Sequence, residues 1–281
     1  MPLDTSAYNL ALLRVDGRRW NELRRIHAQI RTQPAADGSS YLEMGHTKVM
    51  CVVTGPSESG ARRVGTTGGA AAGALGSGGG GSRDGDAEVV VSVVLAGFSS
   101  VDRKRRGRND KGILELQSTI SSALSSSLHT HLYPRSTISI SLHVLSQDGS
   151  LLAALLNAAT LACIDAGIAM TDYVAACTAG STSTYAANDE KADPLLDMNH
   201  QEEQELPGLT VATLGQSDRV IVLVCESRVQ VSRLEGMLAV GVDGCKQVRD
   251  IMDKVVREKG RRMLEEGAIE KGVGLEDMDL D

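Results

Sequence analysis

The sequence contains few aromatic residues. Among its 281 residues there are one Trp, one Phe and five Tyr. Leu, Val, Ile, Ala and Met must therefore supply most of the hydrophobic core, and a chain of this length buries enough of them for one large domain or two small ones.

Long hydrophobic runs are also missing. No apolar stretch approaches the roughly 18 residues that a transmembrane helix needs, and no basic segment followed by an apolar one opens the chain. We therefore expect a soluble, intracellular protein that does not contact a membrane. Five isolated cysteines without a C-x-x-C pair predict buried, reduced thiols and neither a metal site nor a disulfide framework.

Basic residues are fewer than acidic ones. The chain has 29 Lys and Arg against 36 Asp and Glu, a net charge of −7, which argues against a protein that binds nucleic acid over its whole surface. The charge is uneven, however: residues 102–111 read DRKRRGRNDK, whereas residues 189–205 and the C-terminus are acidic. A concentrated basic loop can still bind a phosphate backbone locally.

Residues 138–167 organise the chain. Apolar residues alternate with polar ones from Ile138 to Val144, which predicts a strand with one face in the core. The turn residues 147–150 follow, and from Leu151 the apolar residues become nearly continuous up to Gly167. This pattern is typical of a helix buried in the middle of a domain and ended by glycine.

Similar patterns on both sides predict further elements. Alternation of strand groups with single helices favours an α/β (α+β) fold made of two similar strand-and-helix halves in one compact domain. We expect an N-terminal arm at 1–13, the domain at 14–265, a flexible Gly-rich insertion at 57–87 that lacks a phosphate-loop motif, and an acidic disordered tail at 266–281. The predicted strands cover residues 26–30, 40–44 and 48–54, which form an antiparallel meander, and residues 88–96, 173–179, 209–214 and 219–225. The other helices cover 113–128, which ends before Pro134, and 232–265. Gly241 and Gly244 inside the last helix indicate close packing against a neighbour.

Three features are candidates for function, and the first is a set of basic residues. Clustered guanidinium groups neutralise phosphate charge and make nucleic-acid binding depend on salt. A solvated surface loop or a nuclear-import signal is the alternative interpretation. The candidate RNA-binding residues are Arg62, Arg63, Arg103, Lys104, Arg105, Arg106, Arg108 and Lys111.

The second feature is an acidic stretch. The carboxylates of Asp197 and Glu203 could together hold Mg²⁺, or one of them could act as a general acid. Acid-rich loops are common without catalysis, so a solvated loop is the alternative.

The third feature is the turn before the central helix. Free N–H groups at a helix N-terminus suit an anion, but Leu151 and Leu152 follow the turn where a basic residue would be expected. The sequence favours a simple helix cap, with Asp148 or Ser150 as the capping residue.

Taken together, several motifs resemble the RNase PH family, and in particular the core subunits of the RNA exosome that are of the archaeal catalytic type. The resemblance extends over roughly residues 10–262 outside the Gly-rich insertion. The residues of the motifs DGRRWNELRR and PLLDMN are most similar to those of the eukaryotic, fungal members of the family. The matching motifs are RVDGRR at 14–19, ADGS at 36–39, GHTKV at 45–49, TGP at 54–56, YPRS at 133–136, NAATLA at 157–162, DAGI at 165–168 and PLLDMN at 194–199.

This resemblance implies a subunit of a six-membered ring of paralogues through which RNA threads 3′ end first. Active members of the family attack RNA with inorganic phosphate, which they hold with a Gly-Ser/Thr-Arg triplet, and they use carboxylates where Asp197 and Glu203 stand here. This chain departs from that pattern, since Leu152 stands in place of the arginine and Lys111-Gly112 in place of paired RNA-contacting arginines. Loss of one charged donor could cost 10²–10³ in rate.

The combined hypothesis is a non-catalytic exosome ring subunit in the nucleus, nucleolus and cytoplasm. Asp197, Glu203 and Asp148 would be vestiges of an active site, and no cofactor is expected. Its partners would be RNA, paralogous ring subunits, RNA-binding cap subunits and an associated hydrolytic nuclease. The alternatives are an active phosphate-dependent 3′–5′ exoribonuclease, in which Asp197 is a general acid or a Mg²⁺ ligand, and a scaffold that never contacts RNA.

Overall fold

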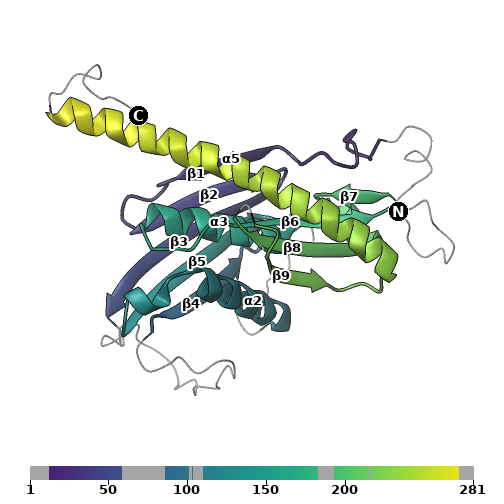
Figure 1. Ribbon diagram of the computed structural model, residues 1–281, viewed down its shortest axis with the longest axis horizontal. Coiled ribbons are helices and arrows are strands. Elements are labelled where there is room, and N and C mark those ends of the chain that lie inside the picture. Colours follow the sequence, from purple (N-terminus) through teal and green to yellow (C-terminus); the bar gives the residue numbers. More distant parts are fainter. Residues whose placement is uncertain are drawn as a thin grey trace.

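The computed structural model describes residues 13–58, 86–100, 103, 110–182, 193–215 and 217–271. Within these residues the chain forms two β-sheets with helices packed on them (Figure 1). The predicted fold class is confirmed, because each sheet is joined to a long helix that follows it in the chain.

The first sheet has five strands in the order β1-β2-β3-β5-β4. Its first three strands form the predicted antiparallel meander, and β4 joins the far edge parallel to β5. The predicted alternation in β5 is confirmed, since Ile138, Ile140, Leu142 and Val144 are fully buried. The strands are β1 (Ile26–Ile30), β2 (Gly38–Met44), β3 (Thr47–Glu58), β4 (Glu88–Leu95) and β5 (Ser136–Ser146).

The second sheet has four antiparallel strands in the order β7-β6-β8-β9. Three of them were predicted, whereas the short β7 was not, because a three-residue strand has no measurable periodicity. The strands are β6 (Val174–Ser181), β7 (Pro194–Leu196), β8 (Gly208–Leu214) and β9 (Val220–Cys225), and the short α4 (His200–Glu205) lies between β7 and β8.

The central helix α3 (Leu151–Asp165) lies between the two sheets and is buried from Leu151 to Cys163. The side chain of Asn157 bonds the backbone of Ala176 in β6, at 2.8 Å and 2.9 Å. On the opposite face of the second sheet runs α5 (Val231–Lys271), which packs on β6 and β8. Every residue of β6 is buried because helices cover both faces of that strand.

Two further helical segments complete the first half. The helix α2 (Lys111–Ser127) packs along β4 and ends, as predicted, before Pro134. A short 3-10 turn, η1 (Thr130–Leu132), leads into β5. Neither α2 nor any other helix of the described ranges is long and apolar enough to cross a membrane.

The glycines inside α5 permit close packing, as predicted. A Cβ on Gly241 would lie 3.1 Å from Val211 Cγ2, and one on Gly244 would lie 2.4 Å from Leu196 Cδ1. The helix continues past the expected end at 265 to Lys271, so the boundary of the predicted tail at 266 was set too early. Residues 272–281 lie outside the described residues.

Other boundary predictions are met only in part. The strand β3 extends through Glu58, so the Gly-rich insertion begins later than the predicted residue 57, and residues 59–85 lie outside the described ranges, as do residues 1–12 of the arm. The prediction of five buried thiols is wrong for Cys225, which is exposed at the end of the edge strand β9. The other four are buried.

Candidate functional site

Asp197 lies at the centre of the site, just after β7. Its side chain has no exposed surface, and its backbone has φ 53°, in the left-handed region that non-glycine residues seldom adopt. Residues held in this way often occur where the surrounding structure fixes a functional group.

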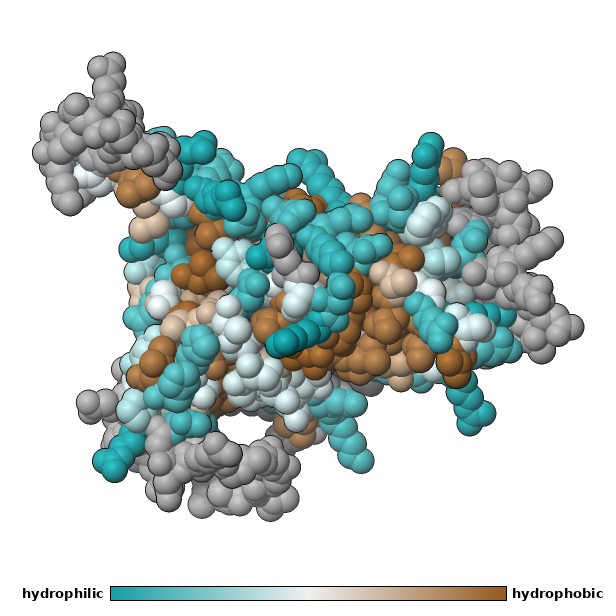
Figure 2. Space-filling model, in the orientation of Figure 1, coloured by the Kyte–Doolittle hydropathy of each residue, from teal (hydrophilic) through white to brown (hydrophobic). Residues whose placement is uncertain are grey.

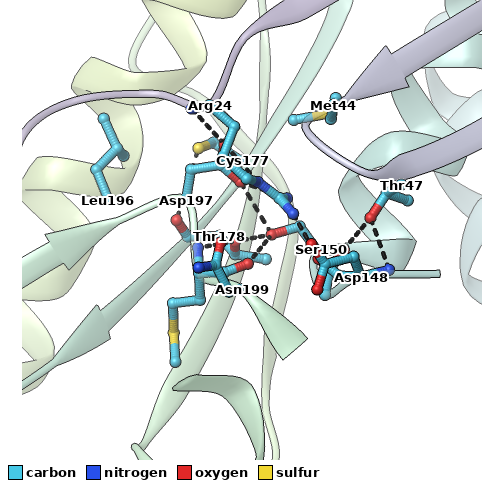
Figure 3. Close-up of polar contacts among 12 residues, drawn as sticks. Arg24, Met44, Thr47, Asp148, Ser150, Cys177, Thr178, Leu196, Asp197 and Asn199 are labelled. Carbon is cyan, nitrogen blue, oxygen red and sulfur yellow. Dashed lines mark hydrogen bonds and ion pairs between the residues drawn. The ribbon is translucent and has the colours of Figure 1, made fainter. Parts of the chain in front are cut away.

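Arg24 holds both carboxylate oxygens of Asp197 (Figure 3). Arg24 Nη2 donates to Oδ1 at 2.7 Å, whereas Nε and the backbone N–H of Arg24 donate to Oδ2 at 3.0 Å and 2.9 Å. The guanidinium also donates through Nη1 to the carbonyl of Asp148. Arg24 is itself buried, so the ion pair is shielded from water.

A hydroxyl completes the shell around Asp197. Ser150 Oγ lies 3.1 Å from Asp197 Oδ1 and 3.0 Å from the carbonyl of Met198. An ionised carboxylate has about four lone-pair positions, and here Arg24 occupies three of them while the Ser150 hydroxyl faces the fourth. Arg24 and Ser150 therefore line both carboxylate oxygens of Asp197.

The charge state of Asp197 follows from the same contacts. Burial by itself raises the pKa of this carboxyl, but the Arg24 guanidinium and its hydrogen bonds outweigh burial and hold the pKa below the ordinary value of 3.8. Asp197 is consequently ionised at neutral pH and has no proton to give as a general acid.

The turn before α3 is built around Ser150, whose φ is 54°, directly after Gly149 at φ 73°. The predicted cap is confirmed in position, because Ser150 is the N-cap residue of α3, but its side chain makes no capping hydrogen bond. The Ser150 hydroxyl points instead to Asp197 and Thr178. Thr47 fixes the turn from the first sheet, since its Oγ1 donates to the Gly149 carbonyl at 2.8 Å and accepts from the Asp148 N–H at 3.0 Å.

Two more arginines from the N-terminal segment hold the same loop, and with Arg24 we call them the arginine clasp. Arg14 forms a buried ion pair with Glu202 and donates to the carbonyls of Leu196 and Asp197. Arg18 donates to the Asp197 carbonyl at 3.1 Å and to Asn199 Oδ1 at 2.9 Å.

Glu203 approaches the same turn, because the charge of Arg24 and the backbone N–H of Ser150 both act on its carboxyl. It lies on the exposed side of α4, and it lines a cavity of about 230 Å³. Desolvation raises the pKa of its carboxyl, with Glu226 adding to the effect. No group of three or more His, Cys, Asp and Glu side chains suited to a metal occurs within the described ranges. Other residues that line the cavity are Thr178, Met198, Leu206, Leu209, Glu226 and Arg228.

The helix terminus that would face a phosphate is apolar. Leu151 and Leu152 form the start of α3, and both are almost completely buried. No basic residue stands in the first turn of the helix, and the guanidinium of Arg24 near it donates to the Asp148 carbonyl.

Only two of the basic candidates lie within the described residues. Arg103 is exposed, with φ 47°, and Lys111 is exposed at the first position of α2. Arg62, Arg63, Lys104, Arg105, Arg106 and Arg108 lie outside the described residues.

Sequence reasoning missed the cation of the site. Asp197 follows an apolar Pro-Leu-Leu segment, and a buried carboxylate needs a positively charged partner. The dense arginines at 14–25 were the available signal, but the residue separation between Arg24 and Asp197 hides their contact.

Comparisons with known proteins identify the family. The sequence model described as 3′ exoribonuclease family, domain 1 (RNase_PH), matches residues 22–169, from before β1 to just after α3. The chain belongs to the RNase PH family.

The relatives of this RNase PH protein agree with the predicted resemblance, which is confirmed. It is 36% identical to the exosome complex component SKI6 of Saccharomyces cerevisiae over 89% of this chain and 92% of that protein. It is 37% identical to human exosome complex component RRP41 over 88% of this chain and 92% of that protein. The crystal structure of rice Rrp46 has the same fold, with a TM-score of 0.68 at 23% identity over 87% of this chain and 100% of that chain.

Proposed function

We propose that this protein is a non-catalytic, RNA-binding ring subunit of an RNA exosome. It lines the channel that threads RNA 3′ end first to an associated hydrolytic exoribonuclease for 3′–5′ processing and decay. Its partners are RNA, paralogous RNase PH-like subunits in a hetero-hexameric ring and RNA-binding cap subunits. It acts without a cofactor in the nucleus, nucleolus and cytoplasm. The names of its relatives as exosome components support this assignment.

The state of Asp197 carries the non-catalytic part of the proposal. The carboxylate is buried and ionised, and Arg24 and Ser150 line both of its oxygens. To act on a substrate it would have to leave an ion pair whose disruption costs about 3–5 kcal/mol. The residue therefore stabilises the loop after β7 and takes no part in chemistry.

The start of α3 supports the same conclusion. Phosphorolysis needs charged donors for phosphate, and removal of one such donor typically lowers the rate by about 10²–10³. Leu151 and Leu152 supply only apolar surface where that donor would stand.

The RNA-binding part of the proposal rests on exposed basic residues. Arg103 and Lys111 flank the basic segment at positions that solvent can reach. In a chain with a net charge of −7, such a local basic surface can still attract a phosphate backbone. In the proposal the remaining basic candidates extend it along the channel.

The edge strand β9 supports the ring. Val220 and Leu223 are 39% and 51% exposed on this strand, and Figure 2 shows hydrophobic residues gathered on the face where Figure 1 draws β8 and β9. An apolar strand that pairs on one side only, as β9 does with β8 among the described strands, favours contact with another subunit.

Charge reversal in the assembled complex tests the proposal. Arg103→Glu and Lys111→Glu together should slow the associated nuclease on long RNA and leave its rate on RNA too short to cross the channel unchanged. Lys254→Glu, at an exposed lysine of α5, is the matched control. Unchanged decay of long RNA by the double variant would refute the channel assignment.

The rival function is a phosphate-dependent exoribonuclease. Family membership and the raised pKa of the Glu203 carboxyl, which favours a proton that an acid catalyst could donate, support it. In this rival function, Mg²⁺ would have to bind without Asp197, because Arg24 holds both oxygens of that carboxylate. Release of nucleoside diphosphates from RNA by the subunit paired with its neighbour, dependent on phosphate and lost in Glu203→Gln, would establish the rival and refute the non-catalytic assignment.

A further inference from the structure

Phe98 is a large aromatic side chain in an unusual place. It is the only Phe of a chain with a single Trp, and it is 69% exposed at the turn after β4. Single exposed apolar residues are common on protein surfaces, so exposure alone assigns nothing. The surroundings of Phe98 are what distinguish it.

The turn that carries Phe98 is fixed by backbone hydrogen bonds on both sides. Ser99 N–H donates to the Ala96 carbonyl at 2.9 Å, which closes the turn. Ala96 N–H donates to the Val144 carbonyl at 3.1 Å, and the Ser99 carbonyl accepts from Gln147 N–H at 2.9 Å. The turn is therefore bound to the end of β5, so Phe98 is presented to solvent from a defined position.

The same contacts place Phe98 between two features of the proposed RNA path. Gln147 directly precedes the turn of Asp148 and Ser150, which holds the former active site. On the other side the chain enters the basic segment, where Arg103 N–H donates to the Ser100 carbonyl at 3.1 Å. An exposed arginine and an exposed aromatic ring thus stand five residues apart in the chain.

We propose that Phe98 is a stacking platform for one base of single-stranded RNA, with Arg103 contacting the adjacent phosphate. Proteins that bind single strands without sequence preference combine a basic surface with aromatic rings on which bases stack. The inference rests on the proposed RNA-binding function, and it assigns a base contact where that function requires only phosphate contacts. Stacking of this kind accepts any base, as a channel for diverse RNA requires.

Variants at position 98 in the assembled complex test the proposal, with single-stranded oligouridylate as the probe. Phe98→Ala should weaken binding about five-fold or more, the loss expected when one stacked base is released. Phe98→Leu should weaken it similarly, because leucine keeps apolar surface but has no π-face. Phe98→Tyr should retain it. The matched control is Val94→Ala, since Val94 is 41% exposed on β4, the strand that leads into the turn.

The other outcomes separate the possible errors. If Phe98→Leu binds RNA as well as the native protein does, the contact is a general apolar one and stacking is overturned. If Phe98→Ala prevents assembly of the subunits, the aromatic side chain packs against a protein partner and the stacking proposal is overturned. If Arg103→Ala weakens binding but Phe98→Ala does not, the stacking inference fails while the proposed function stands. If neither variant changes binding, both fail. Ultraviolet crosslinking of oligouridylate to Phe98 in the native complex is the direct measurement that should succeed.

Discussion

Replacing Asp197 distinguishes a structural residue from a catalytic one. Asp197→Asn keeps the shape of the side chain but removes its charge, and it turns one oxygen into an amide that also donates. Arg24 Nη2, Nε and backbone N–H would then face a group that can accept fewer of their hydrogen bonds. Because Arg24 is buried, its charge would remain without a partner.

The magnitude follows from that buried charge. Breaking one partner of a buried ion pair typically costs about 3–5 kcal/mol, which is a large part of the 5–15 kcal/mol that stabilises a typical domain. We expect Asp197→Asn to lower the free energy of unfolding by about 3 kcal/mol or more. Urea unfolding followed by circular dichroism measures it.

A double-mutant cycle supplies the control. Arg24→Met removes the cation, so Asp197→Asn should cost much less in that background, with a coupling of up to about 3 kcal/mol. The reasoning is refuted if Asp197→Asn alone costs less than about 1 kcal/mol yet abolishes a phosphate-dependent activity. That result would mean that Asp197 is held for chemistry and contributes little to folding.

Further measurements check other parts of the structure. Gly244→Ala should destabilise the protein by about 1–3 kcal/mol, because the new Cβ would lie 2.4 Å from Leu196 Cδ1. Gly260→Ala should stabilise it by up to about 1 kcal/mol, because a Cβ there has no atom within 4 Å. Calorimetry of the two variants tests both predictions. A thiol reagent should modify Cys225 rapidly and the four buried cysteines only on unfolding. The contribution of Asp197 should persist above pH 3.8 and disappear as the pH falls through its still lower folded pKa; unfolding midpoints across this range, compared with the Asp197→Asn variant, measure it.

Much of the fold could be predicted from the periodicity of the apolar residues. The alternation from Ile138 to Val144 and the continuous apolar run from Leu151 correspond to β5 and α3 nearly residue for residue. The glycines of α5 indicated close packing because an interior glycine is costly in a helix unless something needs the space. The order of the strands was not predictable in the same way, since β4 pairs parallel with β5 through a connection that contains α2.

The site was predictable only in its members, not in their roles. Asp197 and Ser150 were both identified, but the sequence favoured a metal ligand or acid for one and a helix cap for the other. Their roles depend on left-handed backbone at both residues and on a contact with Arg24. Neither a φ angle of a non-glycine residue nor a contact between distant segments leaves a periodic trace in the sequence.

Under the proposed non-catalytic function, the arginine clasp gives a structural reason for Asp197 to be retained. The N-terminal segment must be held against the second sheet, and Arg14, Arg18 and Arg24 do so by binding the backbone and carboxylates of the loop at 196–202. Because Arg24 and Asp197 are both buried, loss of either one would leave an unpaired buried charge and destabilise the fold. Selection for stability would then preserve Asp197 and the left-handed turn at Ser150 even without phosphorolysis.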